Sequence, residues 1–360
     1  MTTQHWDNPL GTDGFEFVEY TSKNPADLAR LFELLGFSAI ARHRSKNVTL
    51  YRQGDINFIL NAEPASQAEH FTEIHGPSAN AIAFRVKDVA QAVKTLVGKG
   101  ATLVESGAGP MELRIPAIEG IGGSLIYLVD RYGEQSIYDV DFRPLPGVEQ
   151  RPVGAGLTYI DHLTHNVERG NMDYWAGFYE KFFNFREIRY FDIAGKLTGL
   201  HSRAMTSPCG KIRIPINESS DDKSQIAEYL KDHNGEGIQH IALGTDNIYT
   251  TVETLRERGV RFMDTPDTYY DKIDQRLSQH GEDLERLRRN RILIDGEPMD
   301  KTAADNLLLQ IFTDTVIGPI FYEIIQRKGN QGFGEGNFKA LFDSIEEDQI
   351  RRGVLSAEAG

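Results

Sequence analysis

The sequence predicts an α+β fold of two halves, each built from two βαβββ units, with a further helix at the C-terminus. Short segments rich in β-branched and aromatic residues alternate with amphipathic helical segments along the 360 residues, which is typical of sheets covered by helices. The order of elements in the first half returns in the second, after a stretch rich in proline and glycine. We therefore expect a first domain over residues 1–145, a linker over residues 146–156 and a second domain over residues 157–360.

The first half shows the βαβββ order twice. Apolar residues at every second position predict strands, and apolar residues three or four apart predict helices. Pro25 suits the first turn of a helix, and Gly54 with Asp55 suits a tight turn between two strands. The elements expected here are strand 14–20, helix 25–35, strands 48–51 and 56–60, strand 81–86, helix 89–98, and strands 102–104 and 124–129.

The second half repeats this order with longer connections. A strand precedes a helix whose apolar face runs from Tyr174 to Phe182. A charged insertion over residues 264–300 is helical in pattern from 274 to 291 and has no apolar stripe wide enough for a core. We expect this insertion to be exposed and remote from the chemistry. The strands expected in this half are 159–167, 237–243, 307–312 and 319–325.

Aligning residues 237–260 with residues 78–101 shows what distinguishes the halves. Leucines and glycines coincide, but three polar residues of the second half lack polar counterparts. They are His240, which falls on Ala81, Glu323, which falls on Tyr127 in a further match, and His162, which falls near Gly14. Because the first half keeps the pattern of the fold without these residues, folding alone does not require them. A functional site in the second half is the better explanation.

Each of these three residues lies in an apolar strand. Glu323 shares a strand face with Phe321 and Ile325, and a buried ionised carboxylate is costly unless it is paired or binds a metal. Two imidazoles and one carboxylate on strands of one sheet form the ligand set typical of a mononuclear non-haem Fe(II) site. The alternatives are hydrogen-bonded histidines for His162 and His240 and, for Glu323, an ion pair with a neighbour such as Arg327.

Other polar residues occur in apolar stretches of the same half. Gln310 shares a strand face with Leu308 and Phe312, and Asn217 follows an isoleucine-rich strand. His165 is three residues from His162 and is expected to face away from it, so it is not predicted to be a ligand. Gln239 directly precedes His240, and in a regular strand its side chain points to the opposite face.

The C-terminal segment is rich in glycine from residue 329 and then becomes amphipathic. Apolar residues at helical spacing begin at Phe338 and continue to Ile345. One interpretation is a helix that docks on the core. The other is a hinged aromatic lid over a pocket, and the two are compatible.

Composition excludes several classes of function. The net charge of −14 and the lack of a basic stripe argue against nucleic-acid binding. No apolar run approaches the length of a membrane span, and the first residues lack the pattern of a signal peptide. A single cysteine, Cys209, cannot form an internal disulfide. A cytoplasmic location is therefore expected.

Five motifs of the second half together resemble the bacterial 4-hydroxyphenylpyruvate dioxygenase family. They are Asp161-His-Leu-Thr-His, Arg213-Ile-Pro-Ile-Asn-Glu, Gly237-Ile-Gln-His-Ile-Ala, Leu308-Leu-Gln-Ile-Phe and Gly332-Phe-Gly-Glu-Gly-Asn-Phe. The resemblance extends over nearly the whole chain. It implies a vicinal-oxygen-chelate fold of two barrel domains, related to glyoxalases and extradiol dioxygenases. It also implies one Fe(II) per chain, bound in the second domain by His162, His240 and Glu323.

The resemblance further implies an activity and a pocket. The substrates are 4-hydroxyphenylpyruvate and O2, and the products are homogentisate and CO2, formed in tyrosine and phenylalanine catabolism by decarboxylation, ring hydroxylation and side-chain migration. A homo-oligomer of two or four chains is implied as well. The resemblance places catalytic residues at Gln310, Gln239 and Asn217, and substrate-binding residues at Ser202, Gln225, Phe312, Phe333 and Phe338.

Three alternatives remain open. One is 4-hydroxymandelate synthase, a sister enzyme with the same substrate and ligands, in which residues matching Pro215, Asn217 and Phe338 tend to change. All three are of the dioxygenase type here. The second is an extradiol dioxygenase that cleaves a catechol. The third is a metal-free module of the same fold that binds an aromatic ligand.

Overall fold

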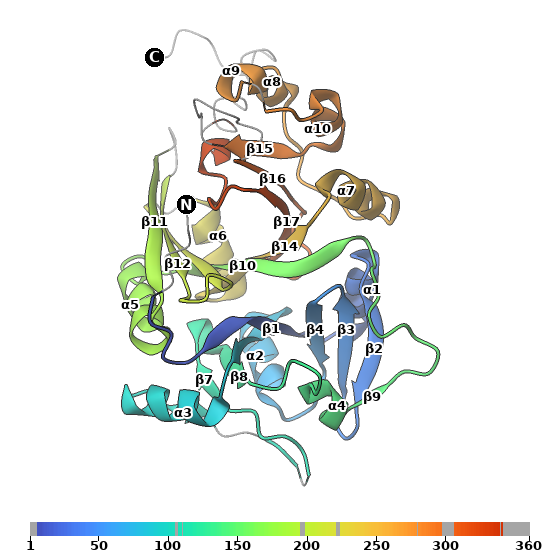
Figure 1. The fold of residues 1–360 in the computed structure, drawn as a ribbon, viewed down its shortest axis with the longest axis vertical. Helices are drawn as coiled ribbons and strands as arrows, with labels where there is room; N and C mark the ends of the chain where they lie inside the picture. Colours follow the sequence, from blue (N-terminus) through green and yellow to red (C-terminus); the bar gives the residue numbers. More distant parts are fainter. Residues whose placement is uncertain are drawn as a thin grey trace.

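The computed structural model describes residues 6–104, 107–109, 111–194, 199–220, 224–278, 280–296, 306–338 and 340. Two curled sheets follow one another along the long axis of the molecule, the N-terminal sheet in blue and teal and the C-terminal sheet in green to red (Figure 1). Residues 335–338 and 340 are helical, while Leu341 to Ile345 of the predicted C-terminal helix lie outside the described residues.

The N-terminal sheet has nine strands in the order β6-β7-β8-β5-β1-β4-β3-β2-β9. Its strands are β1 (Thr12–Thr21), β2 (Ser38–His43), β3 (Val48–Gln53), β4 (Ile56–Asn61), β5 (Ser78–Val86), β6 (Leu103–Val104), β7 (Ala117–Glu119), β8 (Leu125–Val129) and β9 (Phe142–Pro144). Its helices are α1 (Pro25–Leu34), α2 (Gln67–His75), α3 (Val89–Gly98), the 3-10 turn η1 (Ile121–Gly123) and α4 (Ile137–Asp141). The chain order contains two βαβββ units, as predicted, although β2, α2, β7, η1, α4 and β9 were not expected.

The C-terminal sheet has eight strands in the order β11-β12-β13-β10-β14-β17-β16-β15. Its strands are β10 (Leu157–Val167), β11 (Arg186–Ala194), β12 (Gly199–Thr206), β13 (Arg213–Ser219), β14 (Gly237–Thr245), β15 (Leu293–Gly296), β16 (Leu307–Phe312) and β17 (Phe321–Lys328). Its helices are α5 (Met172–Phe183), α6 (Gln225–His233), α7 (Ile248–Glu257), α8 (Asp267–Tyr270), α9 (Ile273–Arg276) and α10 (Leu284–Asn290). The βαβββ order again occurs twice.

The prediction for the insertion was wrong. Instead of one exposed helix from 274 to 291, the chain forms three short helices, α8, α9 and α10. Tyr270, Ile273 and Leu287 on these helices are fully buried. The apolar residues are spread over three elements that pack from different directions, so no single helical stripe shows them.

Sheet register also corrects one match between the halves. His162 pairs with Ala242 on β14, and Phe17 pairs with Ala83, the residue of β5 that matches Ala242. His162 therefore corresponds to Phe17 and not to a position near Gly14. The matches of His240 with Ala81 and of Glu323 with Tyr127 hold, because Ala242 pairs with Glu323 and Ala83 pairs with Tyr127.

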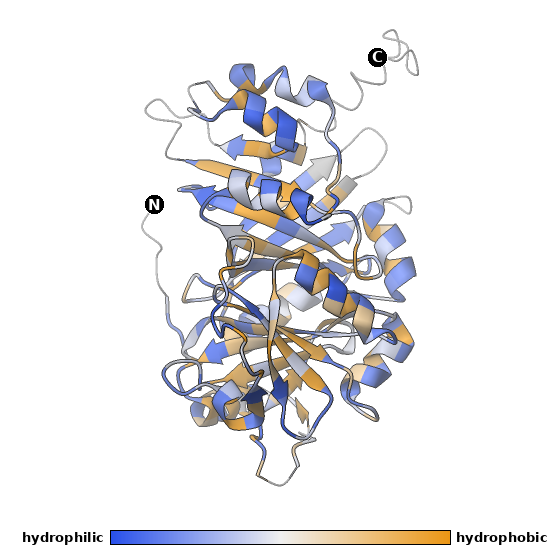
Figure 2. Cartoon of the chain, turned by 90° about the vertical axis from the view of Figure 1, so that its right-hand side faces the viewer, coloured by the Kyte–Doolittle hydropathy of each residue, from blue (hydrophilic) through white to orange (hydrophobic). Residues whose placement is uncertain are grey.

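The two sheets share one core. Hydrophobic residues line the strands in the middle of the molecule, and hydrophilic residues mark the outer faces of the helices (Figure 2). Gln53 of β3 accepts hydrogen bonds from the backbone N–H groups of Ala155 and Leu157, at 2.6 and 3.3 Å. The ring of Tyr322 on β17 stacks on Phe58 of β4, with centroids 5.9 Å apart. The N-terminal sheet therefore supports the strand that carries Glu323. Among the described residues, no helix has the length and apolar character needed to cross a membrane.

Candidate active site

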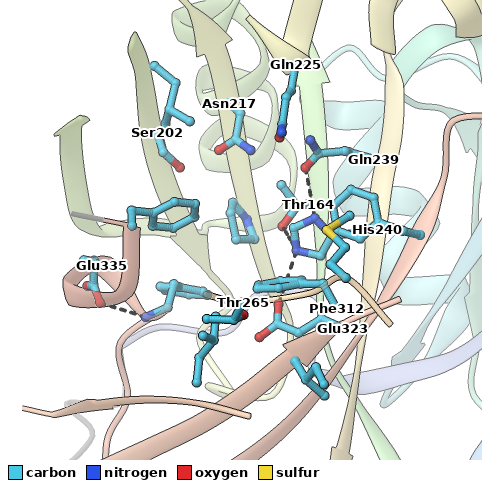
Figure 3. Close-up of a pocket in the computed structure, with 18 of the residues that line it drawn as sticks. Thr164, Ser202, Asn217, Gln225, Gln239, His240, Thr265, Phe312, Glu323 and Glu335 are labelled. Carbon is cyan, nitrogen blue, oxygen red and sulfur yellow. Dashed lines mark hydrogen bonds and ion pairs between the residues drawn. The ribbon is translucent and has the colours of Figure 1, made fainter. Parts of the chain in front are cut away.

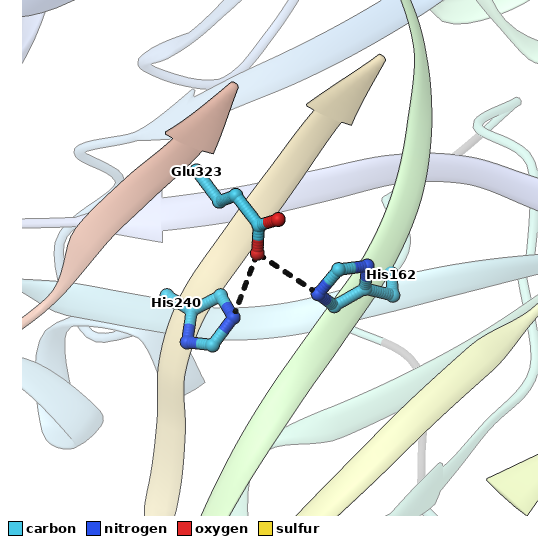
Figure 4. Close-up of side chains that lie close together, drawn as sticks. All are labelled: His162, His240 and Glu323. Carbon is cyan, nitrogen blue, oxygen red and sulfur yellow. Dashed lines mark ion pairs between the residues drawn. The ribbon is translucent and has the colours of Figure 1, made fainter. Parts of the chain in front are cut away.

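Three neighbouring strands of the C-terminal sheet bring His162, His240 and Glu323 together. His162 lies on β10, His240 on β14 and Glu323 on β17, and each offers one potential ligand atom within 4.8 Å of the other two. The Glu323 Oε2 atom lies 3.2 Å from His162 Nε2 and 3.4 Å from His240 Nε2 (Figure 4). All three side chains are buried.

Two β-bulges set the directions of the side chains around this cluster. The pairing of β10 with β14 shifts between Ile160 and His162, where Asp161 is the extra residue, and again at Gln239. A bulge residue breaks strand alternation. Gln239 consequently lines the same cavity as His240, so the expectation that it points to the opposite face was wrong. His165 does face away, as predicted, and its Nε2 lies 2.7 Å from the Tyr179 hydroxyl on α5.

Hydrogen bonds to the Nδ1 atoms fix the tautomers of both histidines. His162 Nδ1 lies 2.8 Å from Asp161 Oδ1, and His240 Nδ1 lies 2.9 Å from Gln239 Oε1. Burial alone raises the pKa of Asp161, but the Arg327 guanidinium, together with His162 and Arg213, outweighs it and holds that pKa well below its usual range. Asp161 is therefore an acceptor, and His162 Nδ1 carries the proton. Both Nε2 atoms then present lone pairs toward the Glu323 carboxylate.

This arrangement requires positive charge at its centre. Two nitrogen lone pairs and a carboxylate oxygen repel one another unless a cation or a proton lies between them. Glu323 Oε1 is also buried and has no hydrogen-bond partner among the described residues. Burial lowers the pKa of His162, but Glu323 and Asp161 outweigh it, and the net direction is upward. The donor set fits a divalent metal with nitrogen and oxygen ligands, and two imidazoles with one carboxylate suit non-haem Fe(II).

A cavity of about 820 Å³ opens beside the three residues, a size typical of small-molecule sites. Side chains from β12, β13, α6 and β14 form a polar wall (Figure 3), and aromatic rings from β11, β16, β17 and the C-terminal segment also line the cavity. The predicted residues that line it, besides the three already described, are Ser202, Asn217, Gln225, Gln239, Phe312, Phe333 and Phe338.

Gln310 is the predicted site residue that does not line this cavity. Its side chain is buried against Gly334, where a Cβ atom would lie 2.2 Å from Gln310 Oε1. That oxygen has no hydrogen-bond partner within the described part of the chain. Gln310 is not among the residues that line the cavity, and its catalytic role stays a prediction.

Sequence reasoning missed several residues that line the site. The Thr164 hydroxyl lies 3.0 Å from His240 Nε2, and the Phe321 ring stacks on His240 with centroids 4.9 Å apart. Strand alternation contained this signal, because Thr164 is two residues from His162 and Phe321 is two residues from Glu323. Thr265, near the start of the insertion, and Arg291, at the end of α10, also line the cavity, so this insertion is not remote from the site.

The alternative interpretation, an ion pair between Glu323 and Arg327, is wrong. The Arg327 Nε and Nη2 atoms donate to Asp161 Oδ2 and Oδ1, both at 2.7 Å. Glu323 is left facing the two imidazoles, which strengthens the case for a metal.

Comparisons with known proteins match both halves. Residues 6–143 match the family model described as the N-terminal domain of hydroxyphenylpyruvate dioxygenase. Residues 159–273 match the glyoxalase, bleomycin resistance protein and dioxygenase superfamily. Hemolysin VllY of Vibrio vulnificus is 68% identical, covering 97% of this chain and 98% of that protein. The 4-hydroxyphenylpyruvate dioxygenase of Pseudomonas aeruginosa is 65% identical, covering 97% of each. The chain belongs to the 4-hydroxyphenylpyruvate dioxygenase family.

A solved structure extends the comparison to the fold. A triple mutant of 4-hydroxymandelate synthase from Streptomyces coelicolor superposes with a TM-score of 0.79 and is 26% identical, covering 94% of this chain and 99% of that one. Membership in the 4-hydroxyphenylpyruvate dioxygenase family confirms the resemblance seen in the sequence. The superfamily match and this superposition confirm the predicted vicinal-oxygen-chelate fold.

Proposed function

We propose that this chain is an Fe(II)-dependent dioxygenase that converts 4-hydroxyphenylpyruvate and O2 to homogentisate and CO2 in tyrosine and phenylalanine catabolism. One observation carries the proposal. Two imidazole lone pairs and a buried carboxylate meet at the wall of a cavity lined by aromatic rings and amides. The 65% identity to the Pseudomonas aeruginosa 4-hydroxyphenylpyruvate dioxygenase supports the same substrate.

His162, His240 and Glu323 hold one Fe(II) per chain in this proposal. Bound there, Fe(II) supplies the activation of O2 and of the 2-oxo acid. Asp161 and Gln239 keep the two imidazoles in the tautomer that presents Nε2 to the metal, and such outer partners raise ligand basicity. The first domain, residues 1–145, provides no ligand, and the second, residues 157–360, provides all three.

The cavity walls position the substrate. Phe333, Phe338 and Phe312 flank the phenol ring, and each aromatic pair contributes about 0.5–1.5 kcal/mol beyond burial. The hydroxyl group and the reacting carbons of the substrate ring face the side-chain amides and the serine hydroxyl of the polar wall. In this assignment Gln239, Asn217 and Gln310 touch the reacting ring, while Ser202 and Gln225 bind the substrate. Gln310 lies close to Gly334, so its contact with the ring would require the backbone there to move.

The remaining assignments concern the setting. The chain acts in the cytoplasm as a homo-oligomer of two or four copies and has neither a nucleic-acid nor a membrane partner. The single cysteine supports the cytoplasmic location, and the net charge of −14 argues against a nucleic-acid partner.

The deciding experiment is O2 uptake by protein reconstituted anaerobically with Fe(II) and given 4-hydroxyphenylpyruvate, with the product identified by chromatography. Homogentisate with matching CO2 release is expected, and Glu323→Ala is expected to abolish both. 4-Hydroxymandelate as the product would assign the sister activity. Ring cleavage of catechols instead would assign an extradiol dioxygenase. Binding of the aromatic ligand without any need for metal would contradict the proposed enzyme and assign a metal-free binding module.

A further inference from the structure

Arg327 contacts both the metal-ligand cluster and the C-terminal segment. Its side chain is only 7% exposed, and its bidentate ion pair with Asp161 is fully buried on the carboxylate side. The same Asp161 Oδ1 that accepts from Arg327 Nη2 also accepts from His162 Nδ1. A guanidinium fork that binds both carboxylate oxygens fixes the plane of that carboxylate. Arg327 thereby sets the orientation of His162 through Asp161.

The other side of the guanidinium binds the backbone of residues 330–333. Arg327 Nη1 donates to the carbonyl oxygens of Asn330 and Gly332, at 3.1 and 2.6 Å. The guanidinium carbon lies 5.6 Å from the centroid of the Phe333 ring. Phe333 in turn lies edge-on to the His162 imidazole, with centroids 5.3 Å apart. The ligand and the aromatic wall are thus held by one side chain from two directions.

A second arginine reinforces the connection. Arg213 of β13 donates through Nη2 to Gln331 Oε1 at 2.8 Å and approaches Asp161 Oδ2 at 3.5 Å. Segment 330–333 is therefore bound at its backbone and at the Gln331 side chain to two cations that also hold Asp161. Local bonds within the segment, such as Gly332 N–H to Asn330 Oδ1 at 2.6 Å, shape its turn.

We propose that Arg327 is a positioning residue that couples metal binding at His162 to the placement of Phe333 over the cavity. This inference rests on the metal site of the proposed function. Because coupling between two sites is reciprocal, metal binding stabilises segment 330–333 against the sheet, and loss of the Arg327 bridge weakens metal binding. Arg327 touches neither the metal nor the substrate, so its effects pass through Asp161 and through the two carbonyl oxygens.

The test uses two readouts that do not depend on turnover. Anaerobic equilibrium dialysis measures Fe(II) affinity, and hydrogen exchange with mass spectrometry measures the protection of a peptide spanning residues 329–338, with and without Fe(II). In the unsubstituted chain, Fe(II) is expected to slow exchange in this peptide. In Arg327→Lys, which keeps the charge but loses the fork, we expect affinity about ten- to a hundredfold weaker. Saturating Fe(II) should then leave exchange of the peptide unchanged.

Arg85→Lys is the matched control. Arg85 pairs with the buried Glu16 at 2.5 Å and lies 5.3 Å from the Tyr132 ring centroid, in the N-terminal half. Any general effect of replacing an arginine that pairs with a buried carboxylate appears in this variant, which should keep both the Fe(II) affinity and the metal-dependent protection.

The outcomes separate this inference from the proposed function. Wild-type-like affinity and protection in Arg327→Lys would overturn the coupling while leaving the metal site intact. Fe(II) binding to the unsubstituted chain without any change in exchange of peptide 329–338 would overturn it as well, even if the variant fails to fold. Failure of the unsubstituted chain to bind Fe(II) at all would instead refute the proposed function.

Discussion

The two halves of the molecule share their bulges but differ at the three positions that hold the candidate metal ligands. In the N-terminal half, β1 and β5 pair with the same register shifts as β10 and β14. The bulge residues are Glu16 and Asn80 in the first half and Asp161 and Gln239 in the second. The positions of His162, His240 and Glu323 are occupied by Phe17, Ala81 and Tyr127.

This difference shows which features belong to the fold and which belong to the candidate metal site. In the first half the Phe17 and Tyr127 rings pack together, with centroids 5.7 Å apart, at the place that corresponds to the metal cluster. Polar groups beside them remain, since Glu16 binds Arg85 and Asn80 binds Glu19. Bulges and buried polar groups therefore belong to the fold. Substitutions at the three ligand positions therefore distinguish the packed core of the first half from the candidate metal centre of the second.

The largest expected effect comes from removing the charge of Glu323. Glu323→Gln keeps the shape but replaces the ligand oxygen pair by an amide, which is a poor metal ligand beside two imidazoles. We expect bound Fe(II) to fall from one per chain to none and turnover to be lost, measured by metal analysis after anaerobic reconstitution. Tyr127→Phe, at the matching position, is the control and should retain one Fe(II). Full metal content in Glu323→Gln would contradict the ligand assignment.

A second prediction is to convert the first half. Phe17→His, Ala81→His and Tyr127→Glu together place the ligand set where Glu16 and Asn80 already stand as orienting groups. We expect two metal ions per chain at saturating Zn(II), the second bound more weakly because Arg85 holds one oxygen of Glu16 through Nε, whereas Arg327 binds both oxygens of Asp161. Mass spectrometry under native conditions counts the ions. A folded triple variant that binds a single ion would show that matched bulges do not suffice to orient the ligands.

The sequence predicted what depends on local pattern. Strand alternation and helical spacing located β10, β14 and β17 and placed His165 on the far side from His162. The local pattern could not locate the bulges, because a bulge depends on the register with a partner strand that is distant in sequence. That is why the direction of Gln239 was wrong and why His162 was matched to the vicinity of Gly14 and not to Phe17. The burial of Tyr270 and Leu287 likewise depends on packing between α8, α10 and the sheet.

A third prediction concerns acid stability. Burial lowers the pKa of His165 to about 3 from an ordinary value of 6.5, and the matching position in the first half is Tyr20, which does not titrate in acid. The folded state keeps His165 neutral, while the unfolded state takes up a proton below pH 6.5. The stability that this contributes is fully present above pH 6.5 and is lost as the pH falls toward 3.

The measurement is the free energy of unfolding in urea from pH 7 to pH 4. His165→Gln removes one titrating group, so its stability should depend less on pH, by at most about 1.4 kcal/mol per pH unit. The amide can still form a hydrogen bond with the Tyr179 hydroxyl, which limits the loss at pH 7. An unchanged pH dependence would assign the acid sensitivity to other groups, such as His233, whose pKa is lowered to about 4 by burial and by His75.

The smallest expected effect comes from Glu19, which occupies the position that matches Thr164. Burial raises its pKa above the ordinary 4.5, although Asn80 and Asn61 donate hydrogen bonds to it. The folded state therefore binds a proton more readily than the unfolded state, and wild-type stability falls as the pH rises above 4.5.

Glu19→Gln keeps both hydrogen bonds, because the two amides donate to one oxygen, and it removes the buried charge. We expect a gain of about 1 kcal/mol at pH 8 in urea unfolding with metal content unchanged. A Glu-to-Gln change is thus expected to abolish the metal site at Glu323 in the second half and to relieve the cost of a buried charge at Glu19 in the first. A loss of stability in Glu19→Gln would mean that the fold needs the charge of Glu19.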